Sequence, residues 1–431
     1  MARQSGGAGV SAAMLARLGV TPSRDAPHRV AILGDSRAAS VAMDGAKRIL
    51  GALSPFNWAN ALIGQRLTLT AMLGVSGERT DQMLARSALA TASGAGLLYL
   101  HAGLNDIAQQ QPSATTSGAV AAANLIAMAR AGRAAGMRVV IEAEVGASNL
   151  TQPQVAQVHA LNARLFAFAA QTPGVWIHDA RAVMLDPGAA EGSTTPRAGF
   201  TYDGTHPSAR GAQAWGRSLA TLLAALVPPV ALPLPASRAD QPGNGRWQLA
   251  RNPLFLDASG GVTGAGASGT VPAQWEARAS TGASVAVSSG GHASAIGNRV
   301  TLSAGFGAAG QSATLLCDLG TAAALPGETV QAFAEVTILD PGALAGVYLE
   351  LTQYTGTGGA SIASCSLRTA SGAGHAGPAA GDRLTLATLP YVMVPAVGAN
   401  PFFVVQVRGE AIGAGNGAFA VDRVGVSRLE L

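Results

Sequence analysis

Apolar and polar positions change their pattern near residue 227, so the two halves of the chain predict different folds. In the first half, short apolar runs alternate with Ala-rich segments of helical length. Apolar runs without polar breaks are typical of buried parallel strands. The predicted strands are Val30–Leu33, Leu67–Leu73, Leu97–Leu100, Val139–Ile141 and Val175–Ile177, and the predicted helices are Ala119–Ala135, Val155–Ala170 and Ala209–Leu226. This alternation indicates βαβ units and a largely parallel sheet covered by helices on both faces.

A Pro-rich segment, Leu226–Pro235, ends this pattern, because prolines at this density continue neither a helix nor a central strand. The short β-like runs after it are separated by Gly, Ser and Asn, which predicts an antiparallel β-sandwich. These runs are Ser284–Val287, Val300–Leu302, Val330–Ile338, Val347–Leu351, Phe402–Val407 and Val424–Leu431. The predicted organisation is an N-terminal extension (1–27), an α/β domain (28–226), a Pro-rich linker (227–245) and an all-β sandwich (246–431).

Composition excludes several classes of protein. Of the 431 residues, 48% are apolar, which is enough to bury sizeable cores and excludes a disordered chain. The net charge of +4 comes from scattered arginines, whereas a nucleic-acid groove needs them clustered. No apolar run is long enough to span a bilayer. Polar residues interrupt the N-terminus, so no Sec signal is predicted, and the compartment stays open between extracellular and virion-associated.

The sequence predicts a site without metal or cofactor. The histidines outside the motifs described below show no metal-ligand spacing. They are His28, His101, His159, His178, His292 and His375. No Walker A or G-x-G-x-x-G motif follows a predicted strand. The two cysteines, Cys317 and Cys365, form either a disulfide or two buried free thiols.

The first motif that carries chemistry closes the first predicted strand with Gly34, Asp35 and Ser36. Gly34 permits a tight turn, and Ser36 opens a helix where open α/β sheets bind ligands. The N–H of Ser36 is then expected at a positive helix end, which stabilises an oxyanion. Asp-Ser before a helix is also an ordinary N-cap. This motif alone therefore leaves both interpretations open.

The second motif, Asp203-Gly204-Thr205-His206-Pro207, precedes the last predicted helix of the first half. The carboxylate of Asp203 can accept from Nδ1–H of His206, which leaves Nε2 to take a proton from a serine. Asp, Gly, Thr and Pro also form ordinary turns, so the alternative is a turn with a surface histidine.

Two further motifs follow predicted strands. Asn105, in Gly103-Leu104-Asn105-Asp106, can offer its amide to a developing oxyanion, or it forms an Asx-turn. Gly77, in the loop after Leu67–Leu73, can bring a main-chain N–H close to a substrate. Gly74 is the other candidate for this donor. The alternative interpretation is a simple loop between strand and helix. Together the four motifs supply a nucleophile, a base, an orienting acid and oxyanion donors.

In type and order, these motifs resemble those of SGNH (GDSL-like) hydrolases over about residues 28–226. The resemblance implies a three-layer α/β/α, flavodoxin-like fold. It also implies Ser36 as nucleophile, His206 as general base and Asp203 as the acid that orients it. The oxyanion hole implied by the family consists of the N–H groups of Ser36 and Gly77 and the amide of Asn105.

Three neighbours of the motifs need an interpretation. Arg37 departs from the family pattern, in which a leucine usually follows the serine. This substitution predicts a charged side chain near the mouth of the pocket. His101 either touches the site or is a packed histidine. Asp35 is interpreted as a turn-forming and capping residue rather than a second acid.

The second half also resembles, more loosely, the jelly-roll modules of bacterial and phage carbohydrate-active enzymes, from Asn252 to Trp275. Aromatic side chains there either stack on sugars or belong to the sandwich core. These side chains are Trp247, Trp275, Tyr348, Tyr354 and Tyr391. The module can alternatively mediate assembly, for example on a virion.

The sequence therefore predicts a serine esterase that removes short acyl groups, above all acetyl, from a carbohydrate through Ser36, His206 and Asp203. One alternative keeps the fold and changes the substrate to a lipid or a small-molecule ester. The other is a non-catalytic glycan-binding or virion tail protein. No nucleic acid or membrane span is expected, and the oligomeric state stays open.

Overall fold

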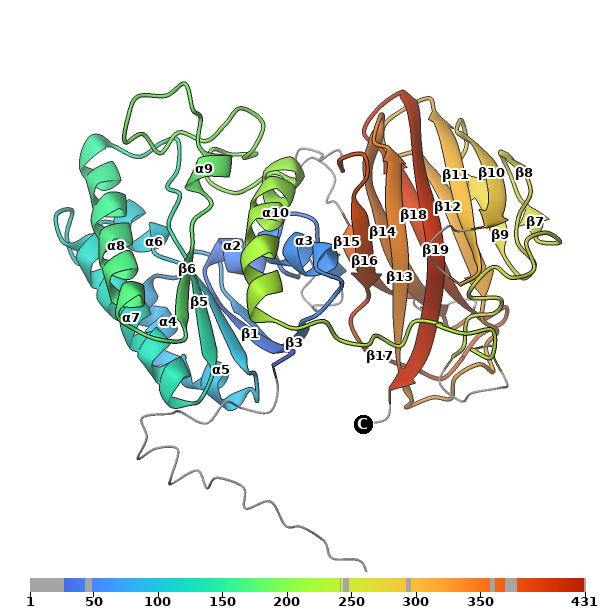
Figure 1. Cartoon of the computed structure of the whole chain (residues 1–431), viewed down its shortest axis with the longest axis horizontal. Coiled ribbons are helices and arrows are strands. Elements are labelled where there is room, and N and C mark those ends of the chain that lie inside the picture. Colours follow the sequence, from blue (N-terminus) through green and yellow to red (C-terminus); the bar gives the residue numbers. More distant parts are fainter. Residues whose placement is uncertain are drawn as a thin grey trace, which may run out of the picture. The chain divides into compact units, whose positions relative to one another are not determined.

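The computed structural model describes most of the chain (Figure 1). The described residues are 27–42, 49–240, 242, 248–291, 296–356, 361–368 and 378–429, with the side chains of 361–363 left out. Outside them lie the predicted N-terminal extension up to residue 26, most of 241–245, Trp247, His292 and His375. The chain divides into two compact units. The first comprises Met1–Ala38, Leu67–Gly146 and Leu150–Arg181, and the second comprises Ala39–Arg66, Ala147–Asn149 and Ala182–Leu431.

A five-stranded parallel sheet organises the first unit (Figure 1). Its order is β3-β1-β4-β5-β6, which becomes 2-1-3-4-5 when only the strands of this sheet are counted. That order is flavodoxin-like. The strands are β1 (Arg29–Gly34), β3 (Thr68–Gly74), β4 (Leu97–His101), β5 (Arg138–Glu142) and β6 (Val175–His178). All five predicted strands are confirmed, and the predicted α/β fold with them.

Helices α7 (Ser117–Ala134) and α8 (Gln152–Ala170) pack on each other and on this sheet. Thr151 begins α8 with a capping box, in which its N–H donates to Gln154 Oε1 at 2.9 Å. Gly136, at φ +79°, follows α7 in the left-handed conformation typical of a glycine just after a helix. The other helices of this region are α2 (Ser36–Ala39), α4 (Thr80–Ala85), α5 (Ala88–Ala92), α6 (Leu104–Ala108) and α9 (Arg181–Met184). In the part of the chain that the structure describes, no helix is long and apolar enough to cross a membrane.

Two helices of the second unit pack closely together, α3 (Pro55–Leu62) and α10 (Ala209–Leu226). Gly216 permits this approach, because a Cβ at that position would lie 2.6 Å from a main-chain oxygen of α3. Ser208 caps α10, and its hydroxyl accepts from an N–H of the first turn. The predicted helix Ala209–Leu226 is confirmed, whereas α3 was not predicted.

Two seven-stranded sheets around one hydrophobic core complete the second unit and confirm the predicted strand-rich second half. The first runs β16-β13-β19-β11-β10-β8, with β17 also paired to β13, and the second runs β2-β15-β14-β18-β12-β9-β7. The strands are β2 (Ile49–Gly51), β7 (Val262–Thr263), β8 (Ala267–Gly269), β9 (Glu276–Ala279), β10 (Ser284–Gly291), β11 (Asn298–Phe306), β12 (Ser312–Asp318), β13 (Thr329–Asp340), β14 (Leu344–Tyr354), β15 (Ser361–Arg368), β16 (Arg383–Ala387), β17 (Tyr391–Val392), β18 (Phe402–Ala411) and β19 (Gly415–Leu429).

The Pro-rich segment packs along this unit. Leu234 is buried against Phe333, and the hydroxyl of Ser427 donates to the carbonyl of Pro233 at 3.2 Å. Gly425 leaves room for the segment, because a Cβ there would lie 2.7 Å from the same carbonyl oxygen. Residues 232–234 thus belong to the packing of the second unit, and the domain boundary near residue 227 stays a prediction.

Candidate functional site

The turn after β1 positions Ser36. Val30–Leu33 is completely buried, and Gly34 follows where a Cβ would lie 2.1 Å from the carbonyl oxygen of His101. Only glycine fits so close an approach of two main chains. The chain then turns through Asp35, and Ser36 opens α2 with a half-buried side chain. The serine therefore lies at the carboxyl end of a central strand, as the motif predicted.

The loops after β3 and β4 hold the predicted oxyanion donors. Gly77 is exposed at φ +81°, a conformation that favours glycine. Asn105 lies in α6, and its Nδ2 donates to the carbonyl of Glu78 at 2.9 Å. Asp106 accepts from both the N–H and the hydroxyl of Thr80, at 3.0 and 2.7 Å, and so ties the two loops together. Because β3, β1 and β4 are adjacent and parallel, these loops and Ser36 follow the same sheet edge.

The loop before α10 holds an acid and an imidazole together in the second unit. His206 Nδ1 lies 2.6 Å from Asp203 Oδ2. Asp203 Oδ1 accepts from the main-chain N–H groups of His206 and Thr205 at 2.7 and 2.9 Å. Partial burial alone would raise the pKa of Asp203, but these hydrogen bonds outweigh it and hold the pKa below its ordinary value. An ionised Asp203 therefore fixes the orientation of the ring through Nδ1. Their joint action with Ser36 is a prediction.

Tyr202 is a neighbour of the imidazole that the sequence analysis missed. Its ring stacks on His206 with 5.6 Å between centroids and 14° between planes. Its N–H donates to the carbonyl of His206 at 3.1 Å. The tyrosine thus covers one face of the imidazole and restricts its rotation. The available signal was an aromatic residue directly before Asp203 in the same tight loop.

The position of Arg37 differs from the prediction. The side chain was expected to place a charge near the pocket mouth, but it is buried. It is 2% exposed, forms an ion pair with Glu144, and donates from Nη2 to the carbonyl of Gly146 at 2.6 Å. The guanidinium thereby fixes the start of the loop after β5. Glu144 is 107 residues away in the chain, so no local pattern announces this partner.

Asp35 is a buried carboxyl next to this ion pair. It has the predicted turn-forming role, since its Oδ1 accepts from the N–H of Arg37 at 2.9 Å. Burial raises the pKa of Asp35 to about 7, against the opposing effect of the Arg37 guanidinium and with a further contribution from Glu144. A carboxyl in this position is protonated below neutral pH.

This pKa predicts how an Asp35→Asn variant will behave. The folded pKa of about 7 exceeds the ordinary 3.8, so the wild type loses stability as pH rises between these values. Asparagine does not ionise. We expect the stability of the variant relative to wild type to increase by about 3 kcal/mol from pH 5 to pH 8. Urea unfolding at both pH values measures this difference, with exposed Glu191→Gln as control. An equal difference at the two pH values would contradict the assignment.

A second His–carboxylate pair is buried in the first unit. His178 Nδ1 lies 2.8 Å from Glu142 Oε2, and the hydroxyl of Tyr99 donates to Glu142 Oε1 at 2.6 Å. Burial would lower the pKa of His178, but the charge and hydrogen bond of Glu142 raise it. His101 lies edge-on to Tyr99, and burial lowers the pKa of His101 to about 4. His101 is therefore a packed, neutral histidine, and the cluster ties β4, β5 and β6 together.

The aromatic candidates of the sandwich divide between core and surface. Trp275, Tyr348 and Tyr391 are no more than 8% exposed, which makes them core residues. Tyr354 is half-buried and stacks on exposed Phe402, with 5.1 Å between ring centroids. The two cysteines, Cys317 and Cys365, are buried free thiols, so the disulfide interpretation is wrong.

Comparison with known proteins assigns the first half of the chain. Residues 32–214 match the model of the GDSL-like lipase/acylhydrolase family. No curated protein matches the chain. One similar solved structure is a GDSL-like lipase from Bacteroides thetaiotaomicron, with 17% identity, 50% of this chain and 97% of that chain covered, and a TM-score of 0.35. Another is an acetyl-xylooligosaccharide esterase from Geobacillus Stearmophilus, with 15% identity, 47% and 97% covered, and a TM-score of 0.37. A third is a structure of carbohydrate-binding modules of the β-sandwich superfamily, with 14% identity, 36% and 57% covered, and a TM-score of 0.28. The assignment rests on the family model.

Proposed function

We propose that the chain, whose residues 32–214 match the GDSL-like lipase/acylhydrolase family, is a carboxylic ester hydrolase that removes short acyl groups, above all acetyl, from a polysaccharide. In this proposal Ser36 is the nucleophile, His206 the general base and Asp203 the orienting acid.

The observation that carries the proposal is the Asp203–His206 pair. The hydrogen bond at Nδ1 commits that nitrogen to the carboxylate, so proton transfer falls to Nε2. The carboxylate also stabilises the imidazolium that forms when the ring takes a proton. An isolated turn histidine has no need of an ionised carboxylate held by two further main-chain hydrogen bonds.

The proposed reaction has two halves. In the first, Ser36 Oγ attacks the ester carbonyl while His206 Nε2 takes its proton. The tetrahedral oxyanion is stabilised by the N–H groups of Ser36 and Gly77 and by the amide of Asn105. The C–O bond to the leaving alcohol then breaks, and His206 returns the proton to that oxygen. In the second half, His206 activates a water that hydrolyses the acyl-enzyme and regenerates Ser36.

We infer the preference for a short acyl group from the residue types next to Gly77, one of the proposed oxyanion donors. The loop after β3 carries Ser76, Gly77 and Glu78 after the single apolar Val75. A long acyl chain needs a continuous apolar surface. The proposal of a polysaccharide as the alcohol part derives from the β-sandwich that the same chain carries.

A substrate panel tests the proposal. We expect acetate release from acetylated xylan, and hydrolysis of p-nitrophenyl acetate at least about 10-fold faster, by kcat/KM, than of the octanoate. A preference for long acyl chains would establish the lipid esterase alternative. Glycan binding without any ester turnover would establish the non-catalytic alternative.

An Asn105→Ala variant tests the oxyanion hole. Loss of one donor is expected to lower kcat by about 10² to 10³, with a smaller change in KM, since the donor acts mainly on the transition state. Asn298→Ala is the matched control, because its amide also donates to a main-chain carbonyl, that of Phe255 at 2.7 Å, but has no proposed role in the reaction. Steady-state kinetics on p-nitrophenyl acetate measures both variants. Equal kcat values in the two would exclude Asn105 from the oxyanion hole.

A further inference from the structure

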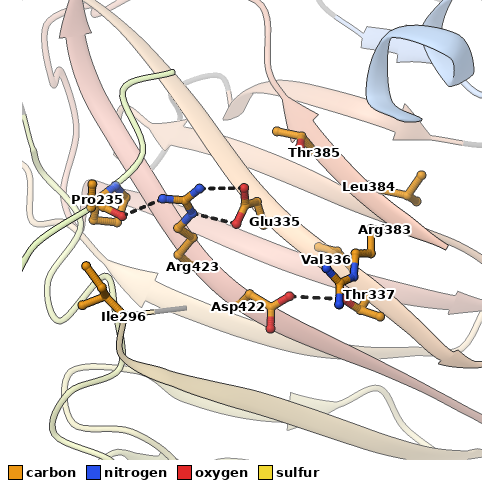
Figure 2. A pocket seen from close by; sticks show the side chains of 11 residues that line it. Pro235, Ile296, Glu335, Val336, Thr337, Arg383, Leu384, Thr385, Asp422 and Arg423 are labelled. Atoms are coloured by element: carbon orange, nitrogen blue, oxygen red, sulfur yellow. Dashed lines mark hydrogen bonds and ion pairs between the residues drawn. The ribbon is translucent and has the colours of Figure 1, made fainter. Parts of the chain in front are cut away.

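A groove with a row of polar and charged side chains runs over the outer face of the sheet formed by β16, β13 and β19 in the second unit (Figure 2). It consists of two neighbouring cavities of about 380 and 370 Å³. Both are lined by Ala236, Glu335, Thr385 and Arg423, so the two cavities adjoin at these residues. A depression that extends over two such cavities can take several units of a linear chain, in contrast to a pocket for one small molecule.

The floor of the groove is a cross-strand row. Glu335 of β13 lies opposite Thr385 of β16 and opposite Arg423 of β19, so the three side chains share one face. Arg423 binds Glu335 through two parallel hydrogen bonds of 2.6 and 2.8 Å (Figure 2). Their side chains are 29% and 32% exposed, which leaves polar atoms available to a ligand. Such a fork-to-carboxylate pair presents a rigid, planar polar surface.

A β-bulge adds Asp422 to the same face. Arg423 pairs with Glu335 and Val421 pairs with Val336, so Asp422 is one extra residue in the register of β19 against β13. Neighbouring residues of a regular strand point to opposite faces, and a bulge removes this restriction. Asp422 and Arg423 therefore both line the groove. Bulges commonly re-aim side chains next to functional sites.

The groove is walled by the Pro-rich segment. The carbonyl of Pro235 accepts from Arg423 Nη1 at 3.0 Å, which fixes the segment beside the row (Figure 2). Ile296 lines the groove as well and is 52% exposed. The wall is thus built by tertiary contacts rather than left by chance between strands.

The charges in the groove are unequal. Glu335 is neutralised by Arg423, and Asp422 by Arg299, which binds both of its oxygens. Arg383 also lines the groove; it is exposed, and among the described residues its guanidinium has no hydrogen-bond or ion-pair partner. In the first cavity, Arg383 is therefore a cation without a counter-charge in the described part of the chain, beside Thr337, Thr385 and the two ion pairs. An anionic group on a ligand would form an ion pair with the Arg383 guanidinium.

We propose that this groove binds a polysaccharide chain that carries carboxylates, such as a chain of uronic acids, with Arg383 contacting a carboxylate and the Glu335–Arg423 pair and Thr385 contacting sugar hydroxyls. The inference rests on the proposed function, since a polysaccharide held in this groove is a polymer that can carry the hydrolysed esters. Its role is to hold that polymer on the protein.

The test uses the full chain and two probes, an oligomer of unesterified galacturonic acid and a neutral xylo-oligosaccharide, in titration calorimetry. We expect the uronic acid oligomer to bind more tightly, Arg383→Ala to weaken it by about 10-fold or more, and Arg383→Lys to retain part of the affinity. Binding is expected to weaken as salt is raised. Arg278→Ala, an exposed arginine on β9 of the other sheet, is the control and is expected to leave binding unchanged.

Equal affinity for the two oligomers, an unchanged affinity in Arg383→Ala, or no binding of either oligomer would each overturn the inference. Turnover of p-nitrophenyl acetate by the wild type is measured in parallel. A wild type that hydrolyses this ester but binds no uronic acid oligomer refutes the groove and leaves the esterase proposal standing. A wild-type protein that binds the uronic acid oligomer but does not hydrolyse p-nitrophenyl acetate refutes the esterase proposal and leaves the groove standing.

Discussion

A Ser36→Ala variant is expected to lose at least about 10⁴-fold of the wild-type kcat on p-nitrophenyl acetate and on acetylated xylan. The substitution removes the only atom proposed to form the acyl-enzyme. Without Oγ no acyl-enzyme forms, and the Asp203–His206 pair can act only on a water molecule. The residual rate should be that of direct attack by water on the ester, in a site that still binds substrate and stabilises an oxyanion.

Ser93→Ala is the matched control for this variant. Ser93 follows α5 and precedes β4, so it lies near the amino end of a strand, away from the edge that carries Ser36. Its hydroxyl donates to the carbonyl of Ala90 at 2.7 Å, and we expect its loss to leave kcat within about 2-fold. Thermal unfolding of both variants establishes that they are folded. Wild-type turnover in folded Ser36→Ala would refute the nucleophile assignment.

An Arg37→Leu variant, which restores the residue usual in the family, is expected to lower the free energy of unfolding by about 3 to 5 kcal/mol. The side chains of Arg37 and Glu144 are each 1% exposed, so the substitution leaves a buried carboxylate without its counter-charge. The carbonyl of Gly146 also loses its donor. Guanidinium chloride unfolding at neutral pH measures the change.

The double variant Arg37→Leu/Glu144→Gln distinguishes the stability lost through the unpaired charge of Glu144 from the stability lost through the packing of Arg37. Removing the second charge should recover about half or more of the lost stability, because a neutral amide costs far less to bury than an unpaired carboxylate. The matched control is Arg181→Leu, since Arg181 and Asp179 form a half-exposed pair in the same unit, and we expect it to cost no more than about 1 kcal/mol. Additive losses in the double variant would show that the ion pair is not what Arg37 contributes.

Much of the architecture was predictable because its causes are local. The helix Ala209–Leu226 was predicted with its observed bounds, since its apolar stripe is local, a serine N-cap directly precedes it and Pro-Pro follows it. The strands around Ser36 were predicted because strands buried on both faces are continuous apolar runs. The Asp203–His206 pair was predictable as well, since a loop of four residues brings its two side chains together.

By itself, then, the sequence determined those elements and the residues of the four motifs. Only the tertiary structure decided which distant residues meet. Ile49–Gly51, from the predicted α/β half, joins β15 as an edge strand of the sandwich. Arg37 is buried because Glu144 neutralises it, and a bulge brings Asp422 to the groove beside Arg423. The physical reason is the same in each case. Strand register, ion pairing and burial depend on partners far away in the chain, whose positions are set only when the whole core packs.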